Sequence, residues 1–167
     1  MFEAPILDPV RFTALGDVVE GRVPASDCDR LAELLYRPQG EIRYRVTGYR
    51  TPDGLPALAL HLEGDLELVC QRCLGGLSFS LNVDSAIVMV HDAAALPDLE
   101  TEAEGVDVIV QPAKVALVDL LEEEILLALP LVPVHAEGMC GAGTGDTPQA
   151  MEQKRPFAAL ERLKTSS

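Results

Sequence analysis

Alternation of apolar and polar residues is the clearest pattern in the first half of the chain. Apolar residues at positions 42, 44 and 46 alternate with polar ones, which is typical of a strand with one buried face. The same alternation begins at Leu77 and becomes a more uniformly apolar run that ends at Val90. Shorter apolar runs at 57–62 and 66–69 predict two further strands. Four successive strands joined by short turns, such as Pro52-Asp53-Gly54, indicate an antiparallel sheet.

Helical spacing of apolar residues occurs in a few places outside these strands. Apolar residues recur at three- and four-residue intervals over 115–129, and Pro130 ends that segment. Ser26 followed by Asp29 resembles a capping box and predicts a short helix there. A proline-led apolar pattern over 156–163 predicts a short terminal helix. We therefore expect an α+β fold, with an antiparallel sheet and two or three peripheral helices in a single domain over 1–167.

Two segments are predicted to be loops. Residues 91–107 contain Pro97 and six acidic side chains without a basic one, which is typical of a mobile or solvated loop, or of an ordered surface crossing. Residues 138–149 begin with four glycines in eight positions, which predicts a Gly-rich loop.

Composition and charge narrow the classes of function. A chain of 167 residues can bury roughly 70% of its unfolded surface, so one core is feasible. The net charge is −14, and residues 84–137 alone hold 12 acidic side chains and one basic one. Neutralising phosphates requires clustered Lys and Arg, so this balance disfavours extensive RNA binding and favours basic protein partners.

A basic and aromatic cluster occupies one predicted strand. Arg43, Arg45 and Arg50 are interleaved with Tyr44 and Tyr49, a composition that can bind RNA backbone or an acidic partner. The alternative is an exposed strand face that pairs with the chain's own acids. The strongly acidic composition favours this second interpretation.

The sequence also predicts where the protein resides. The longest apolar candidate, 115–131, is interrupted by four acidic residues, so no membrane helix is expected. Residues 1–10 carry no basic cluster ahead of an apolar run, so no secretory signal is expected either. We expect a cytoplasmic protein whose four cysteines do not form a disulfide framework.

The sharpest chemical motif is Cys70-Gln71-Arg72-Cys73. Two thiolates three positions apart at a tight turn can hold one metal ion, and His135 and Cys140 supply a second pair of ligands. The set Cys70, Cys73, His135 and Cys140 predicts a closed structural zinc site. The alternative is that the cysteines are small buried apolar residues and His135 is an ordinary loop histidine. A redox C-x-x-C is disfavoured, because that chemistry needs a helix N-terminus after a strand.

Catalytic motifs are absent from the sequence. Asp119 and the run 122–124 supply four carboxylates, but their helical spacing predicts a solvated helix face instead. His61 and His91 have no Ser or Cys nucleophile at a recognisable spacing. There is no Walker loop, dinucleotide fingerprint or H-E-x-x-H motif. The sequence therefore predicts a protein that is not an enzyme.

Four segments together resemble the YceD family of large ribosomal RNA subunit accumulation proteins. They lie at 7–11, 66–73, 122–135 and 156–164, and their order and spacing match over nearly the whole chain. The specific ones are C-Q-R-C and E-I-L-L-A-L-P-L-V-P-V-H.

The resemblance implies a bacterial cytoplasmic protein needed for synthesis, processing or stability of large-subunit (23S) ribosomal RNA, with no established reaction. Some relatives have a cysteine in place of His135 and further cysteines after it, which favours a metal knuckle, whereas this chain keeps only Cys140. We expect a non-catalytic ribosome-biogenesis factor that acts through a basic ribosomal protein or an assembly factor. The alternatives are a metal-assisted nuclease acting on precursor ribosomal RNA and a thiol redox protein.

Overall fold

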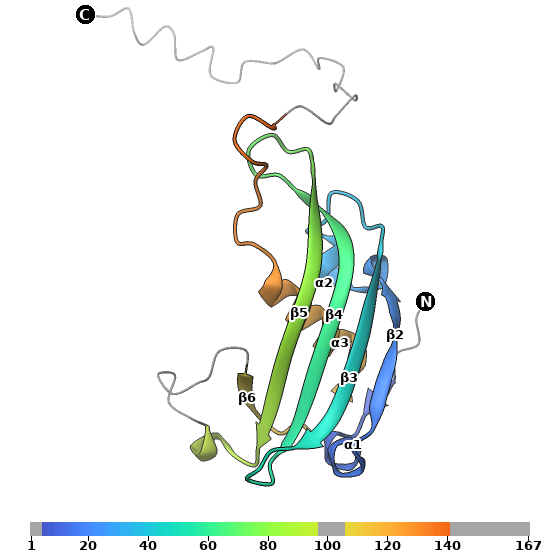
Figure 1. Cartoon of the computed structure of the whole chain (residues 1–167), viewed down its shortest axis with the longest axis vertical. Coiled ribbons are helices and arrows are strands. Elements are labelled where there is room, and N and C mark those ends of the chain that lie inside the picture. The colour runs from blue at the N-terminus through green and yellow to red at the C-terminus, as the bar shows by residue number, and fades with distance from the viewer. Residues whose placement is uncertain (1–4, 97–105, 141–167) are drawn as a thin grey trace, which may run out of the picture.

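A long, twisted sheet forms the body of the protein (Figure 1). The computed structural model describes residues 5–96 and 106–140. Within them the main sheet has the order β2-β3-β4-β5-β6, and its first four strands are antiparallel neighbours. These strands are β2 (Val18–Pro24), β3 (Glu41–Arg50), β4 (Pro56–Val69) and β5 (Gly76–Val90), and β6 (Val106–Val110) pairs with β5 in parallel.

Three helices and a small second sheet surround this main sheet in the described residues. The helices are α1 (Pro9–Leu15), α2 (Asp29–Ala32) and α3 (Leu117–Ala128), and two 3-10 turns are η1 (Ala25–Asp27) and η2 (Ala93–Ala95). Strand β1 (Ile6–Leu7) pairs with β7 (Val115–Ala116) beside the start of α3. The predicted α+β class, with a largely antiparallel sheet and peripheral helices, is confirmed.

The core lies between one face of the sheet and α3. Alternation along β3 buries Ile42, Tyr44 and Val46 and exposes the arginines between them. Helix α3 covers the same face (Figure 1), and its Leu121 and Ile125 are completely buried. The helical pattern predicted over 115–129 is confirmed, although its first two residues form β7 and the helix begins at Leu117.

The prediction of separate strands at 57–62 and 66–69 is wrong. Strand β4 runs without a break through Gly64, where it pairs with Ile42 of β3 and Leu81 of β5. Pairing on both sides holds this polar stretch extended. A Cβ atom at Gly64 would lie 2.8 Å from the Glu41 carbonyl oxygen, so glycine permits the close approach of the two strands.

The capping box predicted at Ser26 is also wrong. Residues 25–27 form η1, and the N-cap of α2 is Cys28, which makes no side-chain capping bond. The cap comes from a distant residue, because the Glu122 carboxylate of α3 accepts a hydrogen bond from the Leu31 N–H at 3.1 Å. The helix α2 therefore depends on tertiary packing and is shorter than the pattern suggested.

Helix α1 and strand β2 were not predicted from the sequence. Helix α1 has a conventional start, because the Asp8 carboxylate accepts from the Arg11 N–H at 3.1 Å and Pro9 occupies the first turn. Gly16 ends it in the left-handed conformation, at a φ of 65°. Asp8 followed by Pro9 is a typical helix start and Gly16 is a typical helix end, so the sequence did contain the signals that predict α1.

Parts of three predictions lie outside the described residues. These parts are 97–105 of the acidic loop 91–107, the Gly-rich loop 138–149 beyond Cys140, and the terminal helix over 156–163. Among the described helices, none combines the length and apolar character that crossing a membrane requires.

Candidate metal centre

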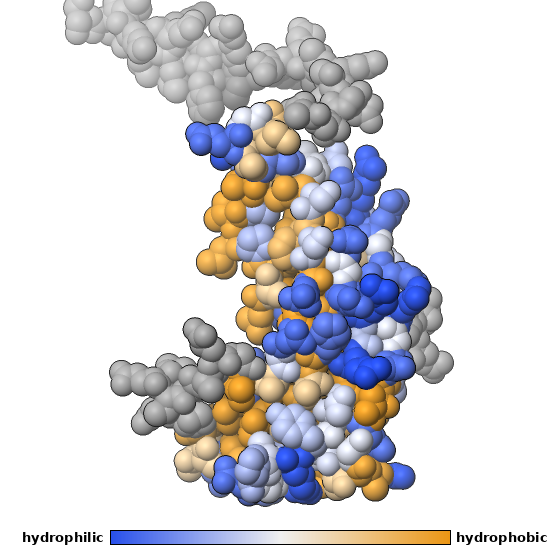
Figure 2. All heavy atoms as spheres, viewed as in Figure 1, coloured by the Kyte–Doolittle hydropathy of each residue, from blue (hydrophilic) through white to orange (hydrophobic). Residues whose placement is uncertain are grey.

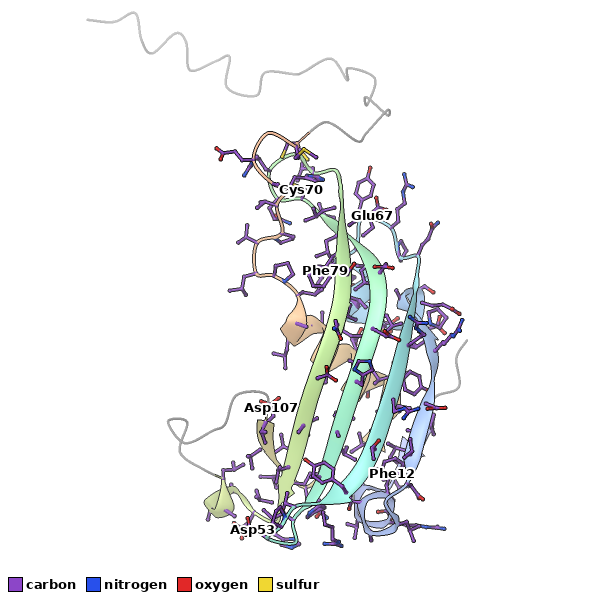
Figure 3. The ribbon with its side chains drawn as sticks, in the orientation of Figure 1. Phe12, Asp53, Glu67, Cys70, Phe79 and Asp107 are labelled. Carbon is purple, nitrogen blue, oxygen red and sulfur yellow. The ribbon has the colours of Figure 1, made fainter. Side chains whose placement is uncertain are left out.

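The turn between β4 and β5 presents two of the predicted ligands. The Cys70 N–H donates to the Gly75 carbonyl at 2.9 Å, and the Leu74 N–H donates to the Cys70 carbonyl at 2.8 Å. Leu74 has a φ of 59°, in the left-handed region that non-glycine residues rarely adopt. This tight backbone path places Cys70 at the far end of the sheet from α1 and Phe12 (Figure 3).

The segment after α3 brings the other two ligands to the same turn. Beyond Pro130 the chain runs back toward the β4–β5 turn (Figure 1), and the Gln71 N–H donates to the Pro133 carbonyl at 2.8 Å. His135 Nε2 lies 3.0 Å from the Gly76 carbonyl oxygen. A carbonyl only accepts, so in the neutral imidazole Nε2 carries the proton and Nδ1 offers its lone pair.

All four predicted ligands lie together. His135 Nδ1 is 3.5 Å from Cys73 Sγ and 3.9 Å from Cys140 Sγ, and the Cys70 and Cys140 sulfurs are 4.0 Å apart. The four ligand atoms lie within 4.8 Å of one another. Zinc bonds of about 2.3 Å to sulfur and about 2.0 Å to nitrogen give roughly 3.5 to 3.8 Å between tetrahedral ligands. The cluster is thus compatible with one metal ion.

The electrostatics of the cluster favour a thiolate at Cys70. Burial alone would raise the pKa of this thiol, but hydrogen bonds from backbone N–H groups of Cys73, His135 and Arg72 lower its pKa to about 5. Burial raises the pKa of Cys140, and the neighbouring sulfurs of Cys73 and Cys70 raise it further. Closely spaced sulfurs cannot all ionise without a cation, which a metal ion would supply.

Cys28 lies outside the cluster. It is completely buried, and the pKa of its thiol is raised to about 11, mainly by burial and further by the charges of Glu122, Asp27 and Asp29. Cys28 is therefore a small buried residue. The C-x-x-C pair lies on a turn between two strands, as predicted, and not at a helix N-terminus.

The prediction of a solvated acidic face on α3 is wrong for two of its residues. Glu122 and Glu124 are only 5% and 6% exposed. Glu122 accepts from Arg30 Nε at 2.7 Å, and Glu124 accepts from the Ser85 hydroxyl at 2.6 Å. The helix has neighbours on two sides, α2 and β5, so these carboxylates lie between elements. Each is bound by a specific partner, which makes both of them structural.

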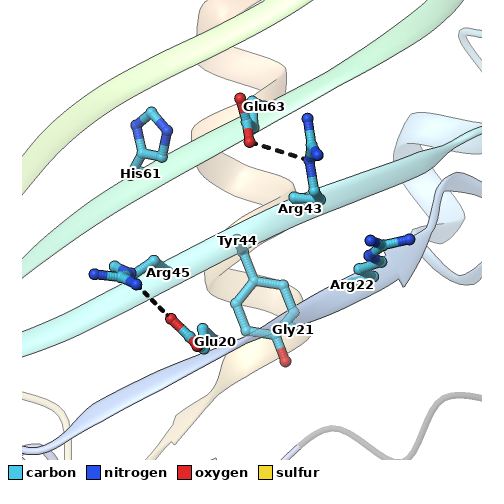
Figure 4. Close-up of a pocket in the computed structure, with 8 residues that line it drawn as sticks. All are labelled: Glu20, Gly21, Arg22, Arg43, Tyr44, Arg45, His61 and Glu63. Carbon is cyan, nitrogen blue, oxygen red and sulfur yellow. Dashed lines mark ion pairs between the residues drawn. The ribbon is translucent and has the colours of Figure 1, made fainter.

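Two of the three arginines of β3 pair with the chain's own acids, as the acidic composition favoured, whereas Arg50 donates to the Gly54 carbonyl at 2.8 Å. Arg43 Nε lies 3.0 Å from Glu63, and Arg45 lies 2.7 Å from Glu20 (Figure 4). These residues border an open pocket of about 530 Å³ on the outer face of the sheet. The Tyr44 ring fills the space where Gly21 has no side chain. Cations already paired with carboxylates make a weak phosphate-binding surface.

These features define a class of small α+β protein, with a long antiparallel sheet that carries three sulfurs and one imidazole at one end. The chain belongs to the YceD family, since the model of the family described as "Large ribosomal RNA subunit accumulation protein YceD" matches residues 58–164. A curated Haemophilus influenzae protein of that name is 26% identical over 167 residues, covering 95% of this chain and 94% of its own. No solved structure gives a significant match. The family resemblance is confirmed, and the matched region contains all four cluster residues.

Proposed function

We propose that the protein is a non-catalytic, cytoplasmic ribosome-biogenesis factor that supports synthesis, processing or stability of large-subunit (23S) ribosomal RNA. The observation that carries this proposal is membership of a family named for accumulation of that RNA. The whole chain, 1–167, would act as one YceD-like domain, because the Haemophilus relative aligns over 95% of it.

The protein acts through a basic ribosomal protein or an assembly factor of the large subunit. Two features support this proposal over extensive RNA contact. The chain carries a net charge of −14, which repels phosphate and attracts basic proteins. The arginines on the outer face of the sheet are bound to Glu63 and Glu20, so few cations remain there for phosphates.

Affinity purification at moderate salt, with and without ribonuclease, tests this route. The expected result is recovery of a large-subunit ribosomal protein or assembly factor that persists after ribonuclease treatment. Loss of binding at high salt should accompany it, because surface charge attraction is screened. Recovery of RNA without any such protein would contradict the proposal.

The cluster holds a structural zinc ion through Cys70, Cys73, His135 and Cys140. Three sulfurs and one imidazole nitrogen are the donors of a closed site, which has no open position for a substrate. When bound, the ion would supply the positive charge that the crowded sulfurs need, and it would join residues 133–140 to the β4–β5 turn. The His135–Gly76 hydrogen bond presents Nδ1 for this purpose.

Zinc content of purified full-length protein tests the site. We expect one zinc ion per chain, its loss in Cys70→Ser with a lowered melting temperature, and its retention in Cys28→Ala. Cys28→Ala is the matched control because Cys28 is equally buried and lies outside the cluster. Negligible zinc in the unmutated protein, or equal zinc in both variants, would contradict the site.

Substitution of His135 separates this role from the alternatives. His135→Cys should retain zinc and stability, because four thiolates also complete a structural site, whereas His135→Ala should lose both. A metal-assisted nuclease would need an open metal position and would lose activity in His135→Cys without losing stability. A redox protein would require Cys70 and Cys73 to cycle between dithiol and disulfide at cytosolic potentials.

A further inference from the structure

An apolar groove lies beside the metal cluster, and within the described residues nothing covers it. The groove, of about 260 Å³, lies between β4, the turn that follows α2, and the end of α3 with the segment after it. Its walls include Leu34, Leu68, Leu126, Leu129, Leu131 and Pro133. Leu131 is 101% exposed, and neighbouring Leu127 and Val132 are 76% and 63% exposed. Figure 2 shows hydrophobic residues gathered along this flank. An exposed apolar surface of this kind usually marks a site where another protein segment or a ligand binds.

We propose that the C-terminal segment of the same chain, residues 154–164, docks in this groove. The segment reads K-R-P-F-A-A-L-E-R-L-K, with Phe157, Leu160 and Leu163 at three-residue intervals. If it is helical, as its sequence predicts, these three side chains share one apolar face. That face has the chemistry that the groove requires.

Charge complementarity supports this occupant. The segment carries four basic side chains and one acidic one, in a chain whose net charge is −14. Residues 117–140, which form α3 and much of the groove wall, carry five acidic side chains and no Lys or Arg. Two of the five acids, Glu122 and Glu124, are buried and already bonded. The basic ends of the segment would therefore be attracted to the exposed Asp119, Glu123 and Glu137, which lie outside the apolar lining of the groove.

The tether also allows the contact. The described part of the chain ends at Cys140, whose sulfur lies 4.0 Å from the Cys70 sulfur. Gln71, which follows Cys70 in sequence, lines the groove, so the segment beyond Cys140 starts close to it. Residues 141–155 can extend roughly 50 Å, far more than this short path requires. A tether of this length gives an effective concentration on the order of millimolar, which favours the chain's own segment over a second copy in dilute solution.

A tryptophan reporter in the full-length protein tests the docking. The chain has no Trp, so Phe157→Trp introduces a single indole. We expect blue-shifted emission and several-fold weaker quenching by acrylamide than for free tryptophan. Adding Leu131→Asp should restore the emission and quenching of an exposed indole. Adding Leu15→Asp is the matched control, because Leu15 is 62% exposed on α1 at the other end of the sheet and should change nothing.

Three results would overturn the proposal. An exposed indole in Phe157→Trp would show that the segment is not docked. A buried indole that Leu131→Asp leaves unchanged would show that it docks elsewhere. Emission that depends on protein concentration, together with a dimeric mass in sedimentation, would assign the groove to a second copy. None of these results depends on ribosomal RNA or on zinc content.

Discussion

At the scale of single residues, Glu122 and Glu124 are both buried on α3, but their surroundings shift their pKa values in opposite directions. Glu122 is buried, which alone would raise its pKa, but hydrogen bonds from Arg30 and Leu31 lower the pKa below its ordinary value. Burial has the largest effect on Glu124 and raises its pKa; the hydrogen bond from Ser85 offsets part of this shift, and the nearby charges of Asp107 and Glu123 add to it. The ionised form of Glu122 stabilises the fold, whereas ionisation of Glu124 costs stability.

The same substitution at these positions should therefore have opposite effects. At neutral pH, Glu122→Gln should lower the free energy of unfolding by about 2 kcal/mol, because it weakens charged hydrogen bonds to Arg30 and Leu31. Glu124→Gln should raise the free energy of unfolding at neutral pH, because it keeps an acceptor for Ser85 and removes the buried charge. Urea denaturation measures both.

The effects of both glutamates on stability should depend on pH. The stabilisation from Glu122 is present above its unfolded pKa and is lost as pH falls through its lowered folded pKa. The penalty at Glu124 develops as pH rises through its raised folded pKa. On acidification the Glu124 difference should thus shrink first, between its raised folded pKa and the ordinary glutamate value of 4.5, whereas the Glu122 difference should shrink only below 4.5. A shift of the same sign in both variants at neutral pH would contradict this account.

The four residues of the cluster could be predicted from the sequence to lie together, but the burial of the carboxylates could not. A C-x-x-C pair, a histidine and a further cysteine are recognisable because few residue types bind zinc. The burial of Glu122 and Glu124 depends on Arg30 and Ser85, which are 92 and 39 positions away in sequence. Helical spacing alone gives the position of a carboxylate around the helix axis, and it does not show which elements pack against that side.

At the scale of elements, the packing of α1 on the sheet depends on a missing side chain. Gly48 of β3 lies beneath α1, and a Cβ atom there would lie 2.6 Å from the Phe12 carbonyl oxygen and 2.7 Å from its ring. The carbonyl belongs to the helix backbone, so only a shift of the whole helix could relieve the clash.

Alanine substitution should separate this packing effect from backbone strain. Gly48→Ala should destabilise the protein by about 2 kcal/mol, because it overpacks the α1–β3 contact. Gly54→Ala, in the β3–β4 turn, should cost only about 1 kcal/mol, because its φ of 82° is unfavourable for alanine but no atom lies within 4 Å. Chemical denaturation of both variants tests the order, and a larger loss in Gly54→Ala would refute it.

Element types were easier to predict than element boundaries. The alternation in β3 and β5 and the helical spacing in α3 identified those elements because each buries one regular face. Strand β4 was divided at Glu63-Gly64-Asp65, where only pairing on both sides keeps the chain extended. Helix α2 was misplaced because its cap is supplied by Glu122 from another helix.

At the scale of the whole molecule, the cluster joins two distant parts of the chain. It lies where the β4–β5 turn meets the segment after α3, and Cys73 and His135 are 62 positions apart in sequence. A metal ion there would hold the exposed apolar segment around Leu131 and Val132 against the sheet. The acidic character of the molecule, together with the pairing of Arg43 and Arg45 with acids, supports the proposal of a basic protein partner.

The ratio of large-subunit to small-subunit ribosomal RNA, in cells that lack the gene, tests the central claim most directly. The account predicts that this ratio falls on deletion and is restored by the native protein and by Cys28→Ala. Cys70→Ser should restore it poorly, because the variant would lose the zinc ion proposed to join residues 133–140 to the β4–β5 turn. An unchanged ratio in cells that lack the gene would contradict the account.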